Sequence, residues 1–402
     1  MPATVSAQPF RIGIAEPEIE DLRARLRRSR RLRVFDRAGW DGGTDPDYLD
    51  ELIRYWRDDF DWRARERELN QLAQFTARIG AATVHYVHET GLRANSMPAL
   101  LLHGWPDSFL RYRKAIPNLV GAKDAALEDL AFDVVVPSLP GFGFTGRIPP
   151  YSEVPSIKSA AQLMHRLMSE VLGYERFVVA GGDGGSAIAQ SLALQFPDAV
   201  IAIHLTDIGW HDNNDGAVLT SAERKYTEAA QKCFMQDGAY VAVHASQPRA
   251  LAASLNDSPT GLASWIVDRF HSWADSPRHF EQSFSKDEML TNITLYWVTQ
   301  TIESSIYGYL AETRQPSLGV GDHVNRPVGL ALFPRDLAGY PPRSLAERSL
   351  NVVRWTEMPS GGHFGAWERP DDFADELKKF VASLLEPLAP GAAYGYSAGK
   401  AV

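Results

Sequence analysis

An aspartate occupies the centre of a glycine-rich turn near the middle of the chain. Residues 178–180 are apolar, residues 181–186 read Gly-Gly-Asp-Gly-Gly-Ser, and good helix formers follow over 187–196. This order predicts a strand, a sharp turn and a helix, the geometry of a nucleophile elbow with Asp183 in the place of serine. A carboxylate is ionised at neutral pH, so it can attack carbon in an epoxide or an alkyl halide and form an ester.

The same glycines allow a different interpretation, a tight turn without chemistry or a loop that cradles a phosphate. The pattern Gly-x-x-x-x-Gly-Lys-Ser/Thr is absent, and no Gly-x-Gly-x-x-Gly with a downstream acidic residue fits better. A serine esterase is disfavoured because Ser186 lies three residues beyond the apex of the turn. The elbow is therefore preferred, and the residues that an ester intermediate requires support it.

An ester on Asp183 needs a base that activates water, and the expected chain order is nucleophile, acid, histidine. His363 follows the last predicted strand, within Pro-Ser-Gly-Gly-His-Phe at 359–364, and Asp336 follows the strand before it. Both lie at the carboxyl edge of a parallel sheet, where Asp336 can orient the imidazole. Asp207, at the end of an earlier strand, is the weaker candidate for the acid, because some hydrolases place the acid one strand earlier.

Backbone N–H groups that could stabilise an oxyanion are expected at two positions. Trp105, in the sequence His-Gly-Trp-Pro, follows an early strand, and Gly184 follows the nucleophile. His103 is interpreted as a strand-end histidine that binds backbone groups, not as a second catalytic residue. His85 and His88 point to opposite faces of a predicted strand and make a poor metal pair. No metal site is predicted.

A largely parallel sheet would bring these side chains together. Continuous apolar runs that end in turn residues and alternate with helical stretches predict strands buried on both faces, and hence an α/β fold. Ligands of such sheets gather at the carboxyl ends of the strands. The runs lie at residues 99–102, 132–136, 177–180, 201–205, 328–333 and 352–355.

The first 90 residues are predicted to be helical and then to turn to strand. Asp45 and Pro46 predict a helix N-terminus, with the aspartate as the cap. Residues 75–79 and 82–87 predict a hairpin. The buried face of the helix is predicted to comprise Leu49, Leu52, Ile53 and Trp56.

Residues from about 211 to 320 interrupt the strand pattern and are predicted to be helical. Thr220 with Glu223, and Ser285 with Glu288, each fit a capping box. A helical insertion between two halves of a parallel sheet suggests a lid over the strand ends. The predicted division is 1–90 for an N-terminal helical region that packs on the core, 91–210 for the first half of the core, 211–320 for the lid, 321–388 for the second half of the core and 389–402 for a flexible tail.

The charge distribution gives little reason to expect a nucleic-acid partner. The formal net charge is −9, which disfavours nucleic acid. Seven of the eleven residues at 23–33 are Arg, which could bind a polyanion. Because Ile19, Leu22 and Leu26 fall at helical spacing, the preferred interpretation is the solvated face of an amphipathic helix.

The number of cysteines and the hydropathy of the chain predict the cellular compartment in which the protein is found. Cys233 is the single cysteine, so an intrachain disulfide and a Cys-based zinc site are excluded. No signal-peptide pattern and no run of eighteen apolar residues is present. We therefore expect a soluble cytoplasmic protein with no membrane partner.

These motifs together resemble the microsomal-type (juvenile-hormone-type) epoxide hydrolases of the α/β-hydrolase superfamily, from about residue 10 to about residue 385. The separation of 27 residues between Asp336 and His363 is similar to the family's acid-to-histidine gap. The motifs that carry the resemblance, besides the Asp183 turn, are His-Gly-Trp-Pro at 103–106, Ser-Leu-Pro-Gly-Phe-Gly-Phe at 138–144, Leu-Asn-Asp-Ser-Pro at 255–259 and Gly-Gly-His-Phe at 361–364.

The resemblance implies two lid tyrosines that hold the epoxide oxygen and protonate it as the ring opens. By position these are Tyr240 and Tyr309, and Tyr307 lies close enough to compete for the second role. A phenol suits this role because it stays protonated at pH 7. The alternative is that these side chains are packed lid aromatics.

The chain departs from the family pattern at the nucleophile. The family usually has Trp after the aspartate, and this chain has Gly184, so the N–H survives but a large wall of the site is missing. A bulkier or unusual epoxide could then fit. The family's acid is often Glu, which makes Asp336 a mild variation. The apolar N-terminal helix of membrane-anchored members is not present in this sequence.

The resemblance implies an enzyme without metal or organic cofactor that converts a small-molecule epoxide and water to a vicinal diol. A homodimer would be unsurprising, and detoxification of aromatic compounds and natural-product biosynthesis are both compatible. Two alternatives stay open: a haloalkane dehalogenase with the same nucleophile, and a non-catalytic binding protein with the hydrolase fold. A dehalogenase would need halide-binding donors, typically a Trp beside the nucleophile, which Gly184 cannot supply.

Overall fold

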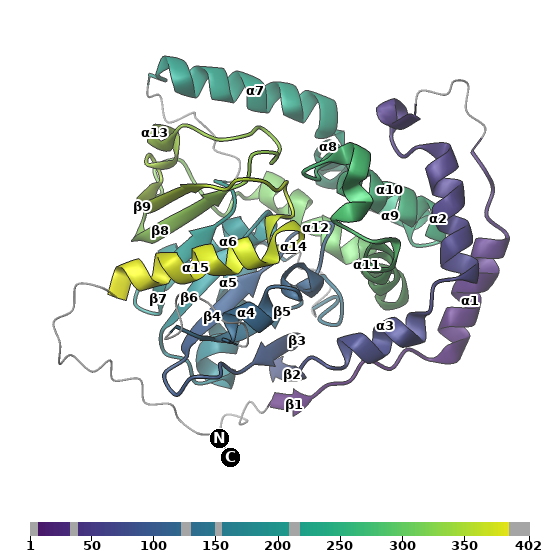
Figure 1. Cartoon of the computed structure of the whole chain (residues 1–402), viewed down its shortest axis with the longest axis horizontal. Helices are drawn as coiled ribbons and strands as arrows, with labels where there is room; N and C mark the ends of the chain where they lie inside the picture. The colour runs from purple at the N-terminus through teal and green to yellow at the C-terminus, as the bar shows by residue number, and fades with distance from the viewer. Residues whose placement is uncertain (1–6, 33–38, 122–129, 149–154, 209–217, 386–402) are drawn as a thin grey trace.

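A single nine-stranded sheet crosses the molecule (Figure 1). The computed structural model describes residues 7–32, 39–121, 130–148, 155–208 and 218–385. The predicted tail at 389–402 lies outside these residues. The strands are β1 (Ala7–Pro9), β2 (Gln74–Ile79), β3 (Ala82–Glu89), β4 (Met97–Leu102), β5 (Phe132–Pro137), β6 (Phe177–Gly181), β7 (Val200–Leu205), β8 (Val324–Leu332) and β9 (Leu350–Glu357).

The larger part of the sheet is parallel, as the sequence predicted. The spatial order is β1-β2-β3-β5-β4-β6-β7-β8-β9. All neighbours from β5 to β9 run parallel, whereas β1, β2 and β3 add an antiparallel edge. Every residue of β4 and β6 is buried, which is why these strands read as unbroken apolar runs. The predicted hairpin is β2 and β3, and it joins the central sheet.

Helices cover both faces of the sheet, and further helices precede and interrupt it (Figure 1). The helices and short helical turns are α1 (Glu16–Arg27), η1 (Gly39–Gly42), α2 (Pro46–Asp58), α3 (Trp62–Leu69), η2 (Phe109–Tyr112), α4 (Ile116–Leu119), α5 (Ile157–Arg166), η3 (Leu167–Val171), α6 (Gly184–Gln195), α7 (Ser221–Asp237), α8 (Ala239–Ser246), α9 (Pro248–Leu255), α10 (Pro259–Ser272), η4 (Pro277–Gln282), α11 (Lys286–Thr299), α12 (Ile302–Arg314), α13 (Arg343–Ala346), α14 (Gly365–Glu368) and α15 (Pro370–Leu385).

The two faces of the sheet form two separate hydrophobic clusters. Successive residues of a strand point to opposite faces, so Leu100 and Leu102 pack with the cluster that includes α5 and α6, and Leu101 packs with the cluster that includes α4 and α15. The core therefore has three layers, helices, sheet and helices, and the loops at the strand ends are left to build a site.

The helices α7 to α12 lie between β7 and β8 in the sequence and contact the loops at the strand ends. Both predicted capping boxes are present, at Thr220 with Glu223 and at Ser285 with Glu288. The side chain of Asn292 in α11 donates to the carbonyl oxygen of Pro106 at 2.8 Å, after β4. These helices therefore stand over the carboxyl ends of the strands.

The N-terminal helices join the core to the helices of the insertion. Asp45 caps α2 through the backbone N–H of Tyr48, and the four predicted apolar residues of α2 are buried. The indole N–H of Trp56 donates to Oγ1 of Thr294 in α11 at 3.0 Å. In α1 the buried residues are Ile19, Leu22 and Leu26, which confirms the amphipathic helix predicted there.

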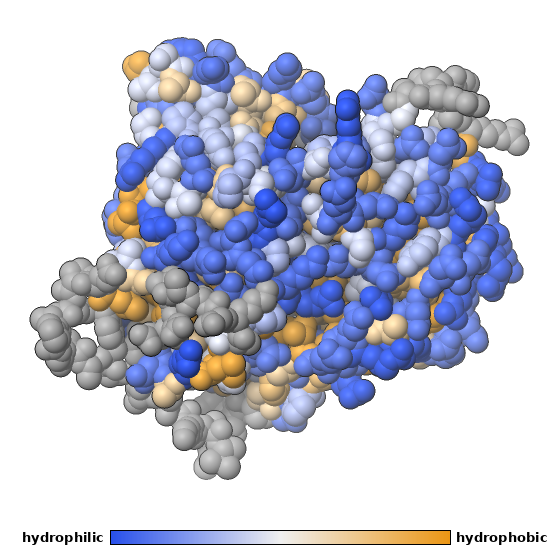
Figure 2. Space-filling model, in the orientation of Figure 1, coloured by the Kyte–Doolittle hydropathy of each residue, from blue (hydrophilic) through white to orange (hydrophobic). Residues whose placement is uncertain are grey.

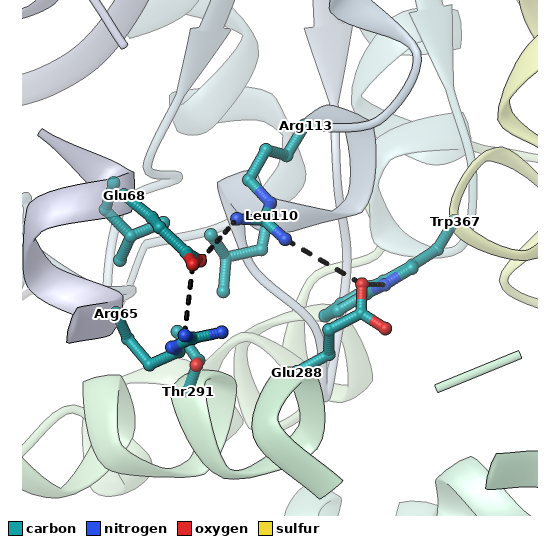
Figure 3. Close-up of a pocket in the computed structure, with 8 residues that line it drawn as sticks. Arg65, Glu68, Leu110, Arg113, Glu288, Thr291 and Trp367 are labelled. Atoms are coloured by element: carbon teal, nitrogen blue, oxygen red, sulfur yellow. Dashed lines mark hydrogen bonds and ion pairs between the residues drawn. The ribbon is translucent and has the colours of Figure 1, made fainter. Parts of the chain in front are cut away.

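A polar pocket lies where the N-terminal helices, the core and the helices between β7 and β8 meet (Figure 3). Glu68 of α3 lies 3.0 Å from Arg65 and 3.5 Å from Arg113, and Arg113 lies 3.8 Å from Glu288 of α11. The charges that line this pocket are thus paired with one another. The pocket lies between α3, η2, α11 and α14, and its lining comprises Arg65, Glu68, Leu69, Leu110, Arg113, Glu288, Thr291 and Trp367.

Hydrophilic residues cover most of the face seen in Figure 2, and hydrophobic residues occur there in small separate groups. Among the described residues, none of the helices combines the length and the apolar character that a membrane span requires. Large exposed apolar side chains such as Leu92, Met235 and Val353 lie far apart in the sequence.

The hydrogen bond between Trp56 and Thr294 allows the contribution of the N-terminal region to the stability of the fold to be tested. Both side chains are buried, so Thr294→Val leaves the indole N–H without an acceptor and should lower the free energy of unfolding by about 1–3 kcal/mol. The matched variant Thr294→Ser keeps the hydroxyl and should lose less. Urea unfolding followed by tryptophan fluorescence measures both. A Thr294→Val protein as stable as the wild type would show that the hydrogen bond contributes nothing.

Candidate active site

The turn between β6 and α6 holds Asp183 in a backbone conformation that few residues adopt. Asp183 has φ 57° and ψ −130°, and a residue other than glycine at positive φ is strained. A Cβ on Gly181 would overlap the carbonyl oxygen of Gly185, and a Cβ on Gly185 would overlap that of Leu102. The glycines therefore allow the strand, sharp turn and helix that the sequence predicted.

Two groups hold the carboxylate of Asp183. Its Oδ1 accepts a hydrogen bond from the backbone N–H of Trp105 at 2.8 Å, and its Oδ2 lies 3.2 Å from Nε2 of His363. Gly104 has to lack a side chain because a Cβ would overlap the Asp183 carboxylate. Gly184 is the first residue of α6, so its N–H belongs to the first helical turn, where N–H groups have no helical acceptor. Of the two predicted oxyanion donors, the Trp105 N–H thus contacts the carboxylate directly, and the Gly184 N–H stays a prediction.

His363 and Asp336 meet although they follow different strands. Nδ1 of His363, after β9, lies 2.8 Å from Oδ1 of Asp336, after β8. The backbone N–H of His363 donates to the carbonyl oxygen of Trp273 at 2.9 Å, and the two rings pack edge to face. Each ring nitrogen of the imidazole therefore contacts one carboxylate.

These carboxylates decide the charge of the imidazole. Burial by itself lowers the pKa of His363, but the negative charges of Asp336 and Asp183 and their hydrogen bonds outweigh burial and raise this pKa to about 10. With this pKa, His363 carries a proton on both ring nitrogens at neutral pH. Both ring nitrogens then donate, one to each carboxylate.

Asp207, the weaker candidate for the acid, takes a different place. Its Oδ2 accepts the backbone N–H of Asp183 at 2.8 Å and the hydroxyl of Ser186 at 2.9 Å. Burial, together with the negative charge of Asp336, raises the pKa of Asp207 to about 6. Of the two candidate acids, Asp336 is hydrogen-bonded to the imidazole, and Asp207 supports the strained turn. Ser186 is buried and turned toward that support.

Tyr240 and Tyr309 come together across the site from the elbow. Tyr240 in α8 stacks on the indole of Trp105 with 5.2 Å between ring centroids, and Tyr309 in α12 meets Tyr240 edge to face at 6.0 Å. Burial raises the pKa of both phenols, and the charge of Asp183 raises the pKa of each further. Both phenols are therefore protonated at neutral pH and can donate.

Tyr307 does not share this position. It precedes Tyr309 by two residues on α12, which turns its side chain about 200° around the helix axis. The ring contacts with Trp105, Tyr240 and His244 are made by Tyr309.

An ion pair behind the site was missed by the sequence analysis. Arg111 and Asp107 are both buried and lie 2.5 Å apart. Arg111 donates to the carbonyl oxygen of His363 at 2.8 Å, and Asp107 accepts the N–H of Gly104 at 2.9 Å. The pair thus joins the loop that carries Trp105 to the loop that carries His363. The signal was an aspartate directly after His-Gly-Trp-Pro with an arginine one helical turn later.

The other histidines considered in the sequence, His103, His85 and His88, have structural partners. His103 is buried, its Nδ1 lies 3.0 Å from the carbonyl oxygen of Gly104, and its Nε2 accepts the N–H of Leu139 at 3.2 Å. This confirms the expectation that His103 binds backbone groups. His85 bonds to Ser138, and His88 bonds to Tyr174. Within the described residues, no group of three or more His, Cys, Asp or Glu side chains could hold a metal ion.

Two protein-family models match the chain. The epoxide hydrolase N terminus matches residues 7–112, and the alpha/beta hydrolase fold matches residues 98–370. The chain is 31% identical to epoxide hydrolase 1 of Sus scrofa, over 94% of this chain and 89% of that protein. It is 29% identical to juvenile hormone epoxide hydrolase 1 of Ctenocephalides felis, over 95% of this chain and 87% of that protein.

Solved structures agree with these relatives. The epoxide hydrolase of Aspergillus niger superposes with a TM-score of 0.83 at 28% identity, over 95% of this chain and 97% of that chain. The juvenile hormone epoxide hydrolase of Bombyx mori has the same fold, with a TM-score of 0.87 at 24% identity over 95% of both chains. The chain is therefore an enzyme that belongs to the epoxide hydrolases of the microsomal and juvenile-hormone type, within the α/β-hydrolase superfamily.

Proposed function

We propose that this enzyme converts an epoxide and water to a vicinal diol through a covalent ester on Asp183. The observation that carries the proposal is the pair of contacts to one carboxylate, with the Trp105 N–H 2.8 Å from Oδ1 and Nε2 of His363 3.2 Å from Oδ2. A carboxylate held in this way can act as a nucleophile. Once it is an ester, its carbonyl carbon lies beside the imidazole that activates water.

In the first step an oxygen of Asp183 attacks one carbon of the epoxide, and the bond from that carbon to the ring oxygen breaks. Tyr240 and Tyr309 donate hydrogen bonds to the ring oxygen, and one of them gives it a proton. The raised pKa of both phenols keeps them protonated before the reaction. The products of this step are a hydroxyalkyl ester and one phenolate.

Alkylation changes His363 because the ester carries no charge. With Asp183 neutral, one of the two carboxylates that raise the pKa of His363 is lost, and this pKa falls. The phenolate takes the proton from the imidazolium. The tyrosine is thereby restored, and His363 becomes a neutral base that Asp336 still orients.

In the second step His363 takes a proton from water as the water attacks the ester carbonyl carbon. The oxyanion accepts hydrogen bonds from the N–H groups of Trp105 and Gly184. The intermediate collapses, the diol oxygen leaves with the proton of His363, and Asp183 is left as a carboxylic acid. Its proton returns to His363, which restores the resting pair. Neither step requires a metal or an organic cofactor.

Other expectations about this chain stay predictions. These are the cytoplasmic location, the homodimer and the choice between detoxification and biosynthesis. No contact in the described residues favours a haloalkane dehalogenase or a non-catalytic binding protein over the epoxide hydrolase, and Gly184 provides no indole for a halide.

Replacing the nucleophile tests the ester. Asp183→Ala should lower turnover of a terminal epoxide by about 10⁴-fold or more, because the covalent route is removed. In one turnover with excess wild-type enzyme in ¹⁸O-labelled water, the diol should carry unlabelled oxygen from the protein, and mass spectrometry should find label in Asp183. Label in the first-turnover diol, or undiminished activity of Asp183→Ala, would rule out the ester.

The two halves of the reaction should separate when His363 is replaced. His363→Gln should still be alkylated but should hydrolyse the ester very slowly, so intact-protein mass should rise by the mass of one epoxide.

Asp336→Asn removes one of the charges that raise the pKa of His363. Stopped-flow measurement should therefore show that ester hydrolysis reaches its plateau at a lower pH than in the wild type. An unchanged pH profile in Asp336→Asn would contradict the assigned role.

The lid tyrosines can be tested against a neighbour on the same helix. Tyr240→Phe and Tyr309→Phe should each slow alkylation by about 10²-fold, because each removes a donor to the ring oxygen. Tyr307→Phe, two residues away on α12, should leave the alkylation rate unchanged. The rate is measured from the quenching of tryptophan fluorescence in a single turnover. A loss in Tyr307→Phe as large as in Tyr309→Phe would overturn the assignment of Tyr309.

A further inference from the structure

The glycines around Asp183 differ in whether the surrounding atoms would leave room for a side chain. At Gly104, Gly181 and Gly185 a Cβ would overlap backbone or nucleophile atoms, and at Gly182 a Cβ would come within 2.5 Å of Arg111 and Thr206. At Gly184 the nearest described atom to a Cβ is the Cα of Gly104 at 3.8 Å, an ordinary contact.

The backbone does not require glycine at this position either. Gly184 is the first residue of α6 and is not among the glycines with positive φ. Glycine is less favourable than alanine in a helix because it loses more conformational freedom on folding. The missing side chain at Gly184 therefore leaves space and satisfies no need of the fold.

That space borders the nucleophile and continues along the helix. Asp183, Gly184 and Ala187 are partly exposed, whereas Gly185 and Ser186 between them are buried. Ala187 lies one turn after Gly184 on the same face of α6. An accessible strip thus begins at the carboxylate, and the only side chain that α6 contributes to it beyond Asp183 is a methyl group. We call Gly184 and Ala187 the small-residue strip.

The strip lies on one particular side of the carboxylate. The described atom nearest to a Cβ on Gly184 is the Cα of Gly104, and Gly104 is the residue whose own Cβ would overlap Oδ1 of Asp183. His363, in contrast, lies beside Oδ2. A group that rests on the strip would therefore lie next to the attacking carboxylate without occupying the place of the imidazole and its water.

We propose that the small-residue strip receives an apolar substituent on the epoxide carbon that Asp183 attacks. The preferred substrates are then internal epoxides, which carry an alkyl or aryl group on both ring carbons. This inference rests on the proposed function. Attack at a terminal CH₂ needs no such space, whereas attack at a substituted carbon brings its substituent against the first turn of α6. The strip is apolar because a glycine and a methyl group provide no side-chain donor or acceptor.

Three isomeric substrates test this without a change in overall hydrophobicity. These are 1,2-epoxyhexane, trans-2,3-epoxyhexane and trans-3,4-epoxyhexane, and kcat/KM is measured for each. The readout is the ratio of the internal to the terminal isomer, so a general loss of activity cancels. The variants are Gly184→Ala, Gly184→Phe and Ala187→Phe. Gly13→Phe is the matched control, because Gly13 is exposed and no described atom lies within 4 Å of its Cβ position.

In the wild type the internal isomers should have a kcat/KM at least equal to that of the terminal isomer. Gly184→Ala should lower the ratio by about tenfold, and Gly184→Phe and Ala187→Phe should lower it by about 100-fold, because each fills the place of the substituent. Gly13→Phe should leave the ratio unchanged. Since Ala187 contributes no backbone N–H to the oxyanion, its variant reports on space even where Gly184→Phe fails to fold.

Ratios that stay within threefold of the wild type in all strip variants would overturn the inference. A wild type that hydrolyses the terminal isomer but neither internal isomer would overturn it as well and leave the proposed function intact. A wild type that hydrolyses none of the three, with no ester on Asp183, would instead contradict the proposed function itself.

Discussion

Asp183 keeps a backbone conformation at positive φ because the atoms around it leave no relaxed alternative. Its own N–H is bound by the carboxylate of Asp207, and its side chain is bound by the Trp105 N–H. Strain of this kind persists only where the surrounding structure determines it from several sides. The close approach of the Leu102 carbonyl to Gly185 is one such side. The result is a carboxylate that projects from the end of β6 instead of packing along α6.

Charge is the second constraint, and it connects the two halves of the proposed reaction. A buried imidazole between two carboxylates is protonated, and such an imidazole cannot activate water. The proposed alkylation of Asp183 removes one of these charges at the moment when a base becomes necessary. Arg111 and Trp273 each hydrogen-bond to the backbone of His363 beside these carboxylates.

The helices above the sheet are tied to the same loops that carry the proposed catalytic groups. Tyr296 donates to the carbonyl oxygen of Asp107 at 2.8 Å, and Asn292 donates to that of Pro106. Trp56 of the N-terminal region reaches the same helix through Thr294. The helices α11 and α2 and the loop of Trp105 are therefore packed together, and Tyr240 of α8 and Tyr309 of α12 contact the indole of Trp105.

Local patterns in the sequence predicted an epoxide hydrolase and the parallel sheet, because a carboxylate between glycines and apolar runs that end in turns can be recognised without tertiary contacts. They did not reveal β1, since three residues carry no periodicity. The sequence ranked Asp336 above Asp207 and Tyr309 above Tyr307, and tertiary contacts distinguish them, since Asp336 meets the imidazole and Tyr309 meets Tyr240. Asp207 and Asp336 follow different strands, and Tyr307 and Tyr309 lie on different faces of one helix, so contacts between residues distant in sequence decide which of each pair is brought to the site.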